Sequence, residues 1–367
     1  MMLILIIILS IYFISIGSLI YGFTKTKNYH TITVKPKTEF TIIVPFRDET
    51  ENLPLLLASL SKLNYPTSLF KVILVDDDSQ EKFQVPTFNF QVSVLNNIRA
   101  SKSPKKDAIV TAMNSVTTDW IITTDADCVV DKNWLSTLDS YIQTHNIAML
   151  VGAVTYDFQS TFLHQFQQLD ISSLQGATIG SFGIKKGFMC NGANLAYTKS
   201  LFQKLNGFEG NDKIASGDDV FLLQKAVTAF PKQVHYLKSE NNIVVTKPLD
   251  DWKSLFYQRV RWASKTSSYQ SVFGKTLGVI VFTGNLAWIW TLGYGLLHFS
   301  SSLLFLNLLA FKIIVDAILI LQSNHFLNSK KISYLLLSSL FYPFFSVSVA
   351  LYSLFGKYEW KGRPFSK

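Results

Sequence analysis

Two aspartates at the end of a short apolar run are the residues of this chain best suited to chemistry. In D-W-I-I-T-T-D-A-D-C, Asp125 and Asp127 stand where a buried strand around Ile121 and Ile122 would end. Residues two apart in an extended chain point to the same side, so both carboxylates can face one hard cation that carries a phosphorylated ligand. The alternative is a polar turn after the strand, the commoner fate of an isolated D-x-D.

Charged clusters follow three predicted strands. From Thr38 to about Tyr236, short β-rich runs alternate with helical stretches, which predicts a mostly parallel sheet with helices on its faces. Ligands bind beyond the carboxyl ends of the strands in such sheets. Clustered acids there favour a binding site over solvated loops, because like charges repel unless a cation or a ligand offsets them. The predicted strands, each with its cluster, are 40–44 before Arg47, Asp48 and Glu49; 71–75 before Asp76, Asp77 and Asp78; and 120–124 before Asp125 and Asp127.

Long apolar segments predict that both ends of the chain lie in a membrane. Hydrophobic residues make up 48% of the 367 residues, and charged residues only 16%. Residues 1–23 carry no charge, are long enough to cross a bilayer and lack the cleavage pattern of a secretory signal. The basic flank after this anchor places the following segment in the cytoplasm. Three further apolar segments, at 276–299, 301–322 and 332–355, predict a multi-pass protein of the plasma (inner) membrane and cell envelope.

The net charge of +9 has a simpler cause in a membrane protein than nucleic-acid binding. Basic flanks of spanning segments, anionic lipid headgroups and phosphorylated substrates all favour lysine and arginine. The two cysteines, Cys128 and Cys190, are far apart and have neither a disulfide framework nor metal-ligand spacing. We therefore predict a membrane protein with a phosphorylated substrate and no nucleic-acid partner.

Three residues within the apolar segments need an explanation. Lys312 and Asp316 lie four apart, so they can pair on one helix face and avoid most of the cost of burial. The pair either holds helices together or contacts a lipid headgroup. Pro343 predicts a kink or a re-entrant bend in the last segment. With a re-entrant bend, the basic tail 357–367 would end in the cytoplasm.

Eight short motifs follow one another along nearly the whole chain. They are V-P-F-R-D-E (44–49), V-D-D-D-S (75–79), K-K-D-A-I (105–109), T-D-A-D-C (124–128), N-G-A-N-L-A (191–196), S-G-D-D-V-F-L (216–222), Q-R-V-R-W (258–262) and W-K-G-R-P-F (360–365). Their order and spacing resemble those of membrane-bound family 2 glycosyltransferases, which include cellulose, chitin and hyaluronan synthases and ceramide glucosyltransferases. The resemblance implies a GT-A-type, Rossmann-like α/β domain in the cytoplasm between N-terminal and C-terminal transmembrane helices.

The same resemblance implies a donor site for a UDP-sugar. Asp76 and Asp77 would face the uracil and the ribose, and Lys105 would approach the nucleotide, although a solvated basic loop is the alternative for this lysine. Asp127, with Asp125 beside it, would hold Mg²⁺ or Mn²⁺ against the diphosphate, whose departure needs charge neutralisation. Asp125 would support the nucleotide or the surroundings of the metal. The donor set is completed by Pro45, Arg47 and Glu49.

The acceptor side needs a general base, because the attacking hydroxyl must lose its proton. The resemblance assigns this role to Asp219, next to Asp218, and implies inversion at the anomeric carbon. The alternative is that both acids cap the helix at 220–229. Contacts to the acceptor or the diphosphate are assigned to Asn191, Gly192, Gln258, Arg261 and Trp262. For the last three, the alternative is a generic cationic and aromatic helix at the membrane surface.

These observations predict a metal-dependent membrane enzyme that glycosylates a lipid or a lipid-linked glycan. A small processive polysaccharide synthase with an export partner is the second interpretation, since Q-x-x-R-W is frequent in processive synthases. A non-catalytic membrane scaffold is the third, and the joint presence of the acidic motifs and Q-x-x-R-W disfavours it. The expected organisation is an anchor at 1–23, a catalytic domain at 38–248, an amphipathic interface helix at 249–273, transmembrane segments at 274–356 and a basic tail at 357–367.

Overall fold

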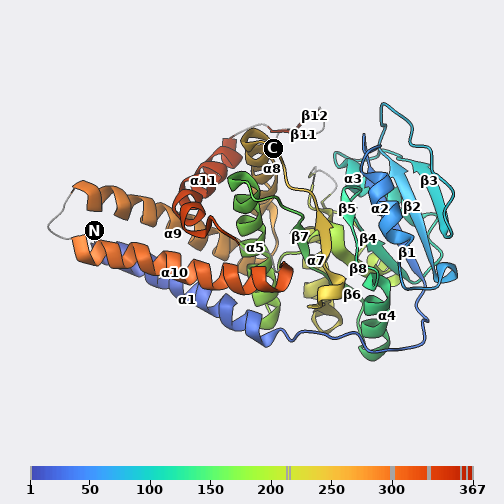
Figure 1. Cartoon of the computed structure of the whole chain (residues 1–367), viewed down its shortest axis with the longest axis horizontal. Helices are drawn as coiled ribbons and strands as arrows, with labels where there is room; N and C mark the ends of the chain where they lie inside the picture. The colour runs from blue at the N-terminus through green and yellow to red at the C-terminus, as the bar shows by residue number, and fades with distance from the viewer. Residues whose placement is uncertain are drawn as a thin grey trace. The chain divides into compact units, whose positions relative to one another are not determined.

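The computed structural model describes residues 2–211, 214, 216–297, 302–328, 332–355, 358–360 and 363–365. The chain divides into two compact units, each made of segments that are distant in sequence. The sheet unit contains Lys27–Asp157 and Phe188–Lys247, and the helical unit contains Met1–Thr26, Phe158–Gly187 and Pro248–Lys367. Figure 1 labels the elements of both units.

The sheet unit is built on a seven-stranded sheet in the order β3-β2-β1-β4-β8-β6-β9. Only β8 runs against its neighbours β4 and β6, and the other adjacent strands are parallel, as predicted. The strands are β1 (Phe40–Phe46), β2 (Phe70–Asp76), β3 (Gln91–Asn96), β4 (Trp120–Thr123), β6 (Met149–Val151), β8 (Leu195–Thr198) and β9 (Val234–Tyr236). The three predicted strands are present, with ends within two residues of those expected. The strands β3, β6, β8 and β9 were not predicted individually.

A second sheet and five α-helices belong to the described part of the sheet unit. In the small sheet, β10 lies between β5 and β7. These elements are β5 (Cys128–Val129), β7 (Val154–Tyr156) and β10 (Val244–Thr246), with α2 (Leu53–Leu60), α3 (Pro104–Met113), α4 (Trp134–Thr144), α6 (Lys199–Lys204) and α7 (Asp218–Ala229).

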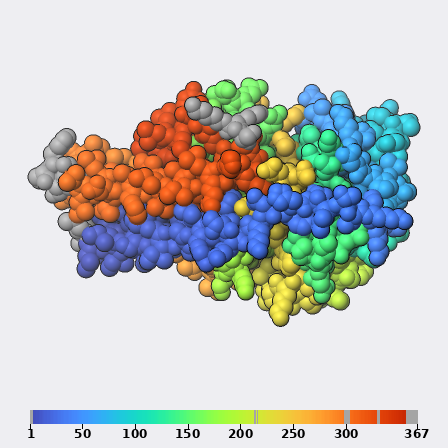
Figure 2. Space-filling model, turned by 60° about the horizontal axis from the view of Figure 1, so that its bottom comes forward, coloured from blue at the N-terminus to red at the C-terminus, as the bar shows by residue number. Residues whose placement is uncertain are grey.

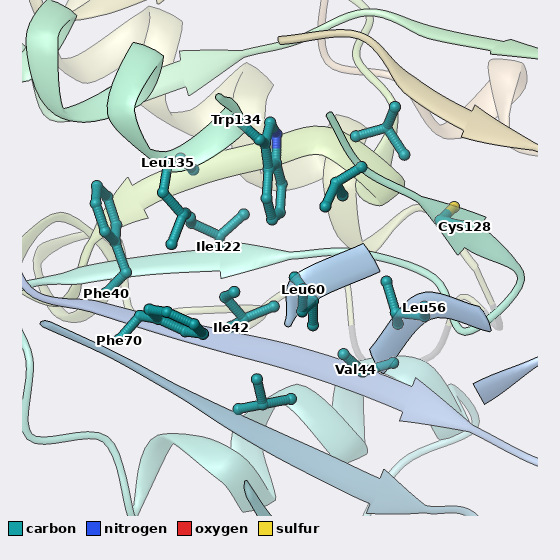
Figure 3. Packing of buried hydrophobic residues seen from close by; sticks show 14 of the residues in the cluster. Phe40, Ile42, Val44, Leu56, Leu60, Phe70, Ile122, Cys128, Trp134 and Leu135 are labelled. Atoms are coloured by element: carbon teal, nitrogen blue, oxygen red, sulfur yellow. The ribbon is translucent and has the colours of Figure 1, made fainter. Parts of the chain in front are cut away.

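The core of the sheet unit follows the two-residue period of β1. Phe40, Ile42 and Val44 point to one face of the sheet and are fully buried. Figure 3 shows them among Leu56 of α2 and Trp134 of α4, which belong to the same buried cluster. Burial of this face of β1 holds the strand in register, so that the residues after Phe46 emerge at a defined edge of the sheet.

An extended segment, Lys27–Glu39, runs along α4 before it enters β1 (Figure 2). The backbone N–H groups of Lys37 and Thr38 donate to the Asp139 carboxylate at 3.3 and 3.1 Å, and the Ile32 N–H donates to Ser140 Oγ at 3.1 Å. Asp139 is buried, so these bonds are shielded from water. The start of β1 is thereby tied to α4.

The helical unit contains the apolar segments. Its helices are α1 (Met2–Lys25), α5 (Phe162–Gly183), α8 (Trp252–Ala263), α9 (Val272–Leu297), α10 (Ser302–Leu327) and α11 (Leu335–Phe355), followed by a hairpin of β11 (Tyr358–Trp360) and β12 (Arg363–Phe365). Four of them, α1, α9, α10 and α11, are long and apolar enough to cross a membrane. The α1 and α10 helices lie side by side (Figure 2).

Glycines allow α1 and α5 to cross at backbone contact. A Cβ at Gly22 would lie 2.0 Å from the carbonyl oxygen of Gly180, and one at Gly183 would lie 1.8 Å from that of Gly22. Small residues permit this close approach between helices in membranes. The predicted catalytic segment 38–248 includes α5, which packs here with the helices of the helical unit.

Two features of the predicted C-terminal apolar segments can be compared with the structure. Leu335–Phe355 is one continuous helix through Pro343, so the re-entrant bend that this proline suggested is not present within it. The boundary between the predicted segments 276–299 and 301–322 lies outside the described residues.

Candidate active site

The ends of β1 and β2 carry the first two charged clusters, and hydrogen bonds join them. The Asp77 N–H donates to the carbonyl of Phe46 at 2.8 Å, and Arg47 donates to the carbonyl of Asp77 at 3.1 Å. Asp48 and Asp78 turn the chain here with φ angles of 52° and 64°, a left-handed region that aspartate tolerates better than most residues. Parallel pairing of the strands thus brings the two predicted donor loops together, next to Pro45 in β1.

Asp76 and Asp77 are both buried and both paired. Asp76 accepts hydrogen bonds from the Ser79 N–H at 2.9 Å and from Lys82 at 3.0 Å. Burial alone would raise the pKa of Asp76, but these hydrogen bonds hold it below its ordinary value. The Arg99 guanidinium donates two hydrogen bonds to Asp77 as a fork, from Nε at 2.8 Å and from Nη2 at 2.9 Å. The side-chain amide of Asn97 donates a third at 2.7 Å.

Sequence reasoning missed Arg99 and Lys82. Arg99 stands three residues after β3, at the same edge of the sheet as the predicted clusters. The run Gln91–Asn96 alternates too weakly to predict a strand, because β3 is half exposed at the edge. Recognition of β3 would have placed Arg99 at the end of a fourth parallel strand.

The D-x-D motif follows β4. Asp125 accepts a hydrogen bond from Lys105 of α3 at 2.6 Å. Asp127 lies in a more repulsive environment, since burial and the charges of Asp125 and Glu49 raise its pKa to about 6. The structure therefore adds Glu49, from the loop after β1, to the acidic surroundings of Asp127. Glu49 itself accepts a hydrogen bond from the Asn52 amide at 2.6 Å.

Lys105 connects the D-x-D motif to the predicted base motif. Its Nζ lies 2.6 Å from Asp125 Oδ1 and 3.7 Å from Asp218 Oδ2. Burial alone would lower the pKa of Lys105, but the two carboxylates raise it, so the lysine is a cation at neutral pH. The solvated-loop alternative for Lys105 therefore does not describe its environment.

Asp218 and Asp219 begin α7, directly after Gly217, which has a φ of 84° that suits glycine. The two oxygens of Asp219 accept the N–H of Val220 at 2.7 Å and the N–H of Gly192 at 2.8 Å. A Cβ at Gly192 would lie 3.1 Å from both Asp218 Oδ2 and Lys105 Nζ. The loop at 191–194 and the base motif therefore lie in contact. Within this loop, the side-chain oxygen Oδ1 of Asn191 accepts a hydrogen bond from the Ala193 N–H at 3.0 Å.

Tyr197 of β8 is a further neighbour that sequence reasoning missed. Its ring is buried, and its hydroxyl has no hydrogen-bond partner among the described residues. Burial and the nearby Asp218 charge raise the pKa of Tyr197, so its hydroxyl stays protonated. A strand-interior tyrosine carries no sequence signal for such a position.

A divalent cation fits the carboxylates after β4. Asp125 and Asp127 offer hard oxygen ligands, and burial together with the charges of Asp125 and Glu49 raises the pKa of Asp127, an environment that a bound cation would relieve. No group of three or more histidine, cysteine, aspartate or glutamate side chains forms a ready metal cage within the described ranges. This donor set suits Mg²⁺ or Mn²⁺, which complete their coordination with substrate phosphates and water.

The remaining predicted residues, Gln258, Arg261 and Trp262, lie on α8 in the helical unit. The N-terminus of α8 is capped by Asp251, which accepts the Ser254 N–H at 2.8 Å. Gln258, Arg261 and Trp262 are all half-buried. The predicted helix of 249–273 is shorter in the structure and ends at Ala263.

Comparisons with known proteins agree with this architecture. Residues 41–205, just under half of the chain, match the family model "Glycosyl transferase family 2". The chain therefore contains a family 2 glycosyltransferase domain with a GT-A fold, and it is an enzyme of the glycosyltransferase class. No curated protein sequence matches the chain.

Solved structures are similar in fold at low sequence identity. The mannosyltransferase PcManGT of Pyrobaculum calidifontis, in complex with GDP-Man and Mn²⁺, is 13% identical over 96% of this chain and 98% of that chain, with a TM-score of 0.55. S. aureus TarS 1-349 in complex with UDP-GlcNAc is 15% identical over 89% of this chain and 96% of that chain. Its TM-score is 0.43.

Proposed function

We propose that the protein transfers a sugar from a UDP-sugar to a lipid or lipid-linked glycan acceptor at the cytoplasmic face of the plasma membrane. One observation carries the proposal: Lys105 lies between Asp125 of the D-x-D motif and Asp218 of the base motif. Donor and base motifs that are far apart in sequence therefore share one edge of the sheet. The four apolar helices support the membrane location and a lipid-borne acceptor.

In this proposal, the donor binds across the ends of β1, β2 and β4. Asp76 and Asp77, held by Lys82 and Arg99, offer carboxylate oxygens to the base and the ribose. Lys105 binds the diphosphate with Pro45, Arg47 and Glu49 nearby. Asp127 and Asp125 hold Mg²⁺ or Mn²⁺, which neutralises the charge that develops on the departing diphosphate. The Mn²⁺ of the mannosyltransferase complex supports this choice of cation.

Asp219 accepts the proton of the attacking acceptor hydroxyl. Each of its oxygens accepts one backbone N–H, which fixes the carboxylate and leaves a lone pair on each oxygen for the hydroxyl. One base and one displacement invert the anomeric carbon. Asn191 and Gly192 border the acceptor, Gln258 and Trp262 contact the acceptor, and Arg261 reaches the diphosphate.

The first experiment identifies the donor. Purified full-length protein is incubated with Mg²⁺ or Mn²⁺ and a panel of UDP-sugars with GDP-Man, with and without vesicles made from the total lipid extract of the expression host. We expect UDP release that the vesicles stimulate and a product with a single sugar on lipid. A ladder of polymers would instead support the small polysaccharide synthase. Release from GDP-Man alone would refute the uridine donor, and release that survives complete chelation would refute the metal role of Asp127.

The second experiment tests the base. Asp219→Asn keeps the size of the side chain and one of its two backbone hydrogen bonds, because the amide nitrogen cannot accept the other N–H, and it cannot accept the proton. We expect transfer to fall at least about a hundredfold while UDP-sugar binding stays unchanged. Transfer at the wild-type rate in this variant would refute the assignment.

A further inference from the structure

The helical unit contains a buried arginine, Arg259, that stands at one of the two x positions of the Q-x-x-R-W motif. Arg259 of α8 is 5% exposed, less than its neighbours Arg261 and Trp262. Its Nε donates to Oδ2 of Asp170 on α5, which is also 5% exposed. The two residues are 89 positions apart in the chain. A membrane-surface helix needs no such pair, because its cations would reach water or lipid headgroups.

Asp170 has a second partner on a third helix. Tyr342 of α11 donates its hydroxyl hydrogen to Asp170 Oδ1 at 3.1 Å. Both oxygens of the buried carboxylate are therefore hydrogen-bonded, one by an arginine and one by a tyrosine. A buried charge in this environment is tolerated when its partners are complete. The result is a chain of contacts from α11 through α5 to α8.

The same guanidinium also contacts two residues of the Q-x-x-R-W motif, Gln258 and Trp262. Arg259 NH1 donates to the side-chain carbonyl of Gln258, and Arg259 Cζ lies 4.2 Å from the centre of the Trp262 ring. A guanidinium can do both at once, since it is planar, donates in its plane and stacks on aromatic faces. One buried side chain thus contacts the first and the last residue of Q-R-V-R-W.

We propose that Arg259, Asp170 and Tyr342 form a positioning triad that holds Gln258 and Trp262 in the orientation used for acceptor binding. The inference rests on the proposed function, in which Gln258 and Trp262 contact the acceptor. The triad fixes the positions of the Gln258 and Trp262 side chains, and two of its members, Asp170 and Tyr342, lie outside every sequence motif. Misplacement of a contact residue by about an ångström costs a reaction up to about a hundredfold, so such positioning has a measurable effect.

A second triad in the same unit provides a matched control. Lys312 donates to Asp316 Oδ2 at 2.7 Å, and Tyr12 donates to Asp316 Oδ1 at 2.6 Å. The chemical groups are the same, a cation, an aspartate and a tyrosine hydroxyl, but Lys312 and Asp316 share α10 and only Tyr12 comes from another helix, α1. Both hydrogen bonds lie within the group of Tyr12, Lys312 and Asp316, on α1 and α10. Tyr12→Phe and Tyr342→Phe therefore each remove a hydroxyl donor from an aspartate, partly exposed Asp316 in the first and buried Asp170 in the second, and only the second should affect the motif.

The first test reads the ring of Trp262 without any substrate. Full-length protein is labelled with 5-fluorotryptophan, and Trp262→Phe identifies one fluorine line among those of the 7 tryptophans. We expect Arg259→Lys and Tyr342→Phe to shift or broaden that line, and Tyr12→Phe to leave it in place. Tyr342→Phe is the stricter variant, because its effect on Trp262 passes through Asp170 and Arg259. An unchanged Trp262 line in Tyr342→Phe would refute the triad.

The second test reads acceptor use, with UDP release measured against the concentration of vesicles made from total lipid extract. Lysine keeps the charge beside Asp170 but loses the contact with Gln258 and the stacking on Trp262. We expect Arg259→Lys and Tyr342→Phe to raise the half-saturating lipid concentration about tenfold or more, with the KM for UDP-sugar and the lipid-independent release unchanged. An unchanged half-saturating concentration, or an equal rise in Tyr12→Phe, would refute a positioning role.

Trp262→Ala separates this inference from the proposed function. If lipid still stimulates Trp262→Ala fully, the acceptor role of the motif is wrong, whatever the triad does. If Trp262→Ala abolishes stimulation while Arg259→Lys and Tyr342→Phe behave as wild type, the motif role stands and the triad is wrong.

Discussion

Asp127→Asn should stabilise the metal-free protein and abolish its activity. Burial, Asp125 and Glu49 raise the pKa of Asp127 from 3.8 to about 6, which means that the folded protein resists its ionisation. At pH 7 this difference corresponds to at most about 3 kcal/mol of lost stability. Asparagine is uncharged and similar in shape, so it relieves the repulsion without a cavity. For a unit of this size, the melting temperature should rise by up to about 5–10 °C.

The pH dependence of this gain follows from the sign of the shift. The pKa of Asp127 is higher in the folded state than in the unfolded state, so its protonated form favours folding. The destabilisation is complete above about pH 6, declines as the pH falls and is absent below 3.8. The difference in melting temperature between Asp127→Asn and wild type should therefore be largest at pH 7 and vanish near pH 4.

Thermal unfolding of the purified protein in detergent, scanned from pH 4 to 8 with and without Mn²⁺ and UDP, measures both effects. Mn²⁺ with UDP should stabilise wild type by about 3 kcal/mol at a hundred times its dissociation constant, and it should leave Asp127→Asn unchanged. Asp119→Asn is the control, since Asp119 is an exposed carboxylate just before β4. A variant Asp127→Asn that melts at or below the wild-type temperature at pH 7 would refute the electrostatic account of this site.

Three further predictions follow from single contacts. Gly192→Ala places a methyl group 3.1 Å from Asp218 Oδ2 and Lys105 Nζ, so the turnover number should fall about tenfold or more. The melting temperature should change by at most a few degrees. Steady-state kinetics and thermal unfolding measure the two quantities, and an unaltered turnover number would contradict this packing. Arg99→Ala should raise the KM for UDP-sugar about tenfold at constant kcat, because Asp77 loses both bonds of its fork; an unchanged KM would exclude Asp77 from donor binding. Gly22→Ala should lower the melting temperature in detergent, because its Cβ would meet a backbone oxygen at 2.0 Å, whereas Gly17→Ala on the same helix meets nothing within 4 Å and should be neutral or stabilising. Equal melting of the two glycine variants would show that the helix crossing does not contribute to stability.

Local patterns of the sequence predicted β1, β2 and β4, the charged residues at their ends, and the helices that are long and apolar enough to span a membrane. The runs at 40–44, 71–75 and 120–124 are rich in β-branched and apolar residues, and each is buried in β1, β2 and β4. The apolar segments were recognisable because crossing a bilayer requires about 20 consecutive apolar residues. These properties depend on residues that are near one another in the chain, so a single sequence contains them.

Contacts between distant residues were decided by the tertiary structure. The bond from Lys105 to Asp125 and the approach of Lys105 to Asp218 depend on how α3, β4 and α7 pack, and no periodicity encodes that arrangement. The fork of Arg99 on Asp77 depends on an edge strand whose pattern is too weak to recognise.

Arg259 illustrates the physical reason most clearly. On the sequence alone it was one more cation of a membrane-surface helix, because a helical wheel distinguishes faces but not the partners that cover them. Its burial against Asp170 requires that α5, from the middle of the chain, pack beside α8 and α11. The sequence by itself determined the chemical groups this protein possesses and the elements that carry them. Only the tertiary structure decided which charges are neighbours, because electrostatic and hydrogen-bonding energies depend on distances that packing sets.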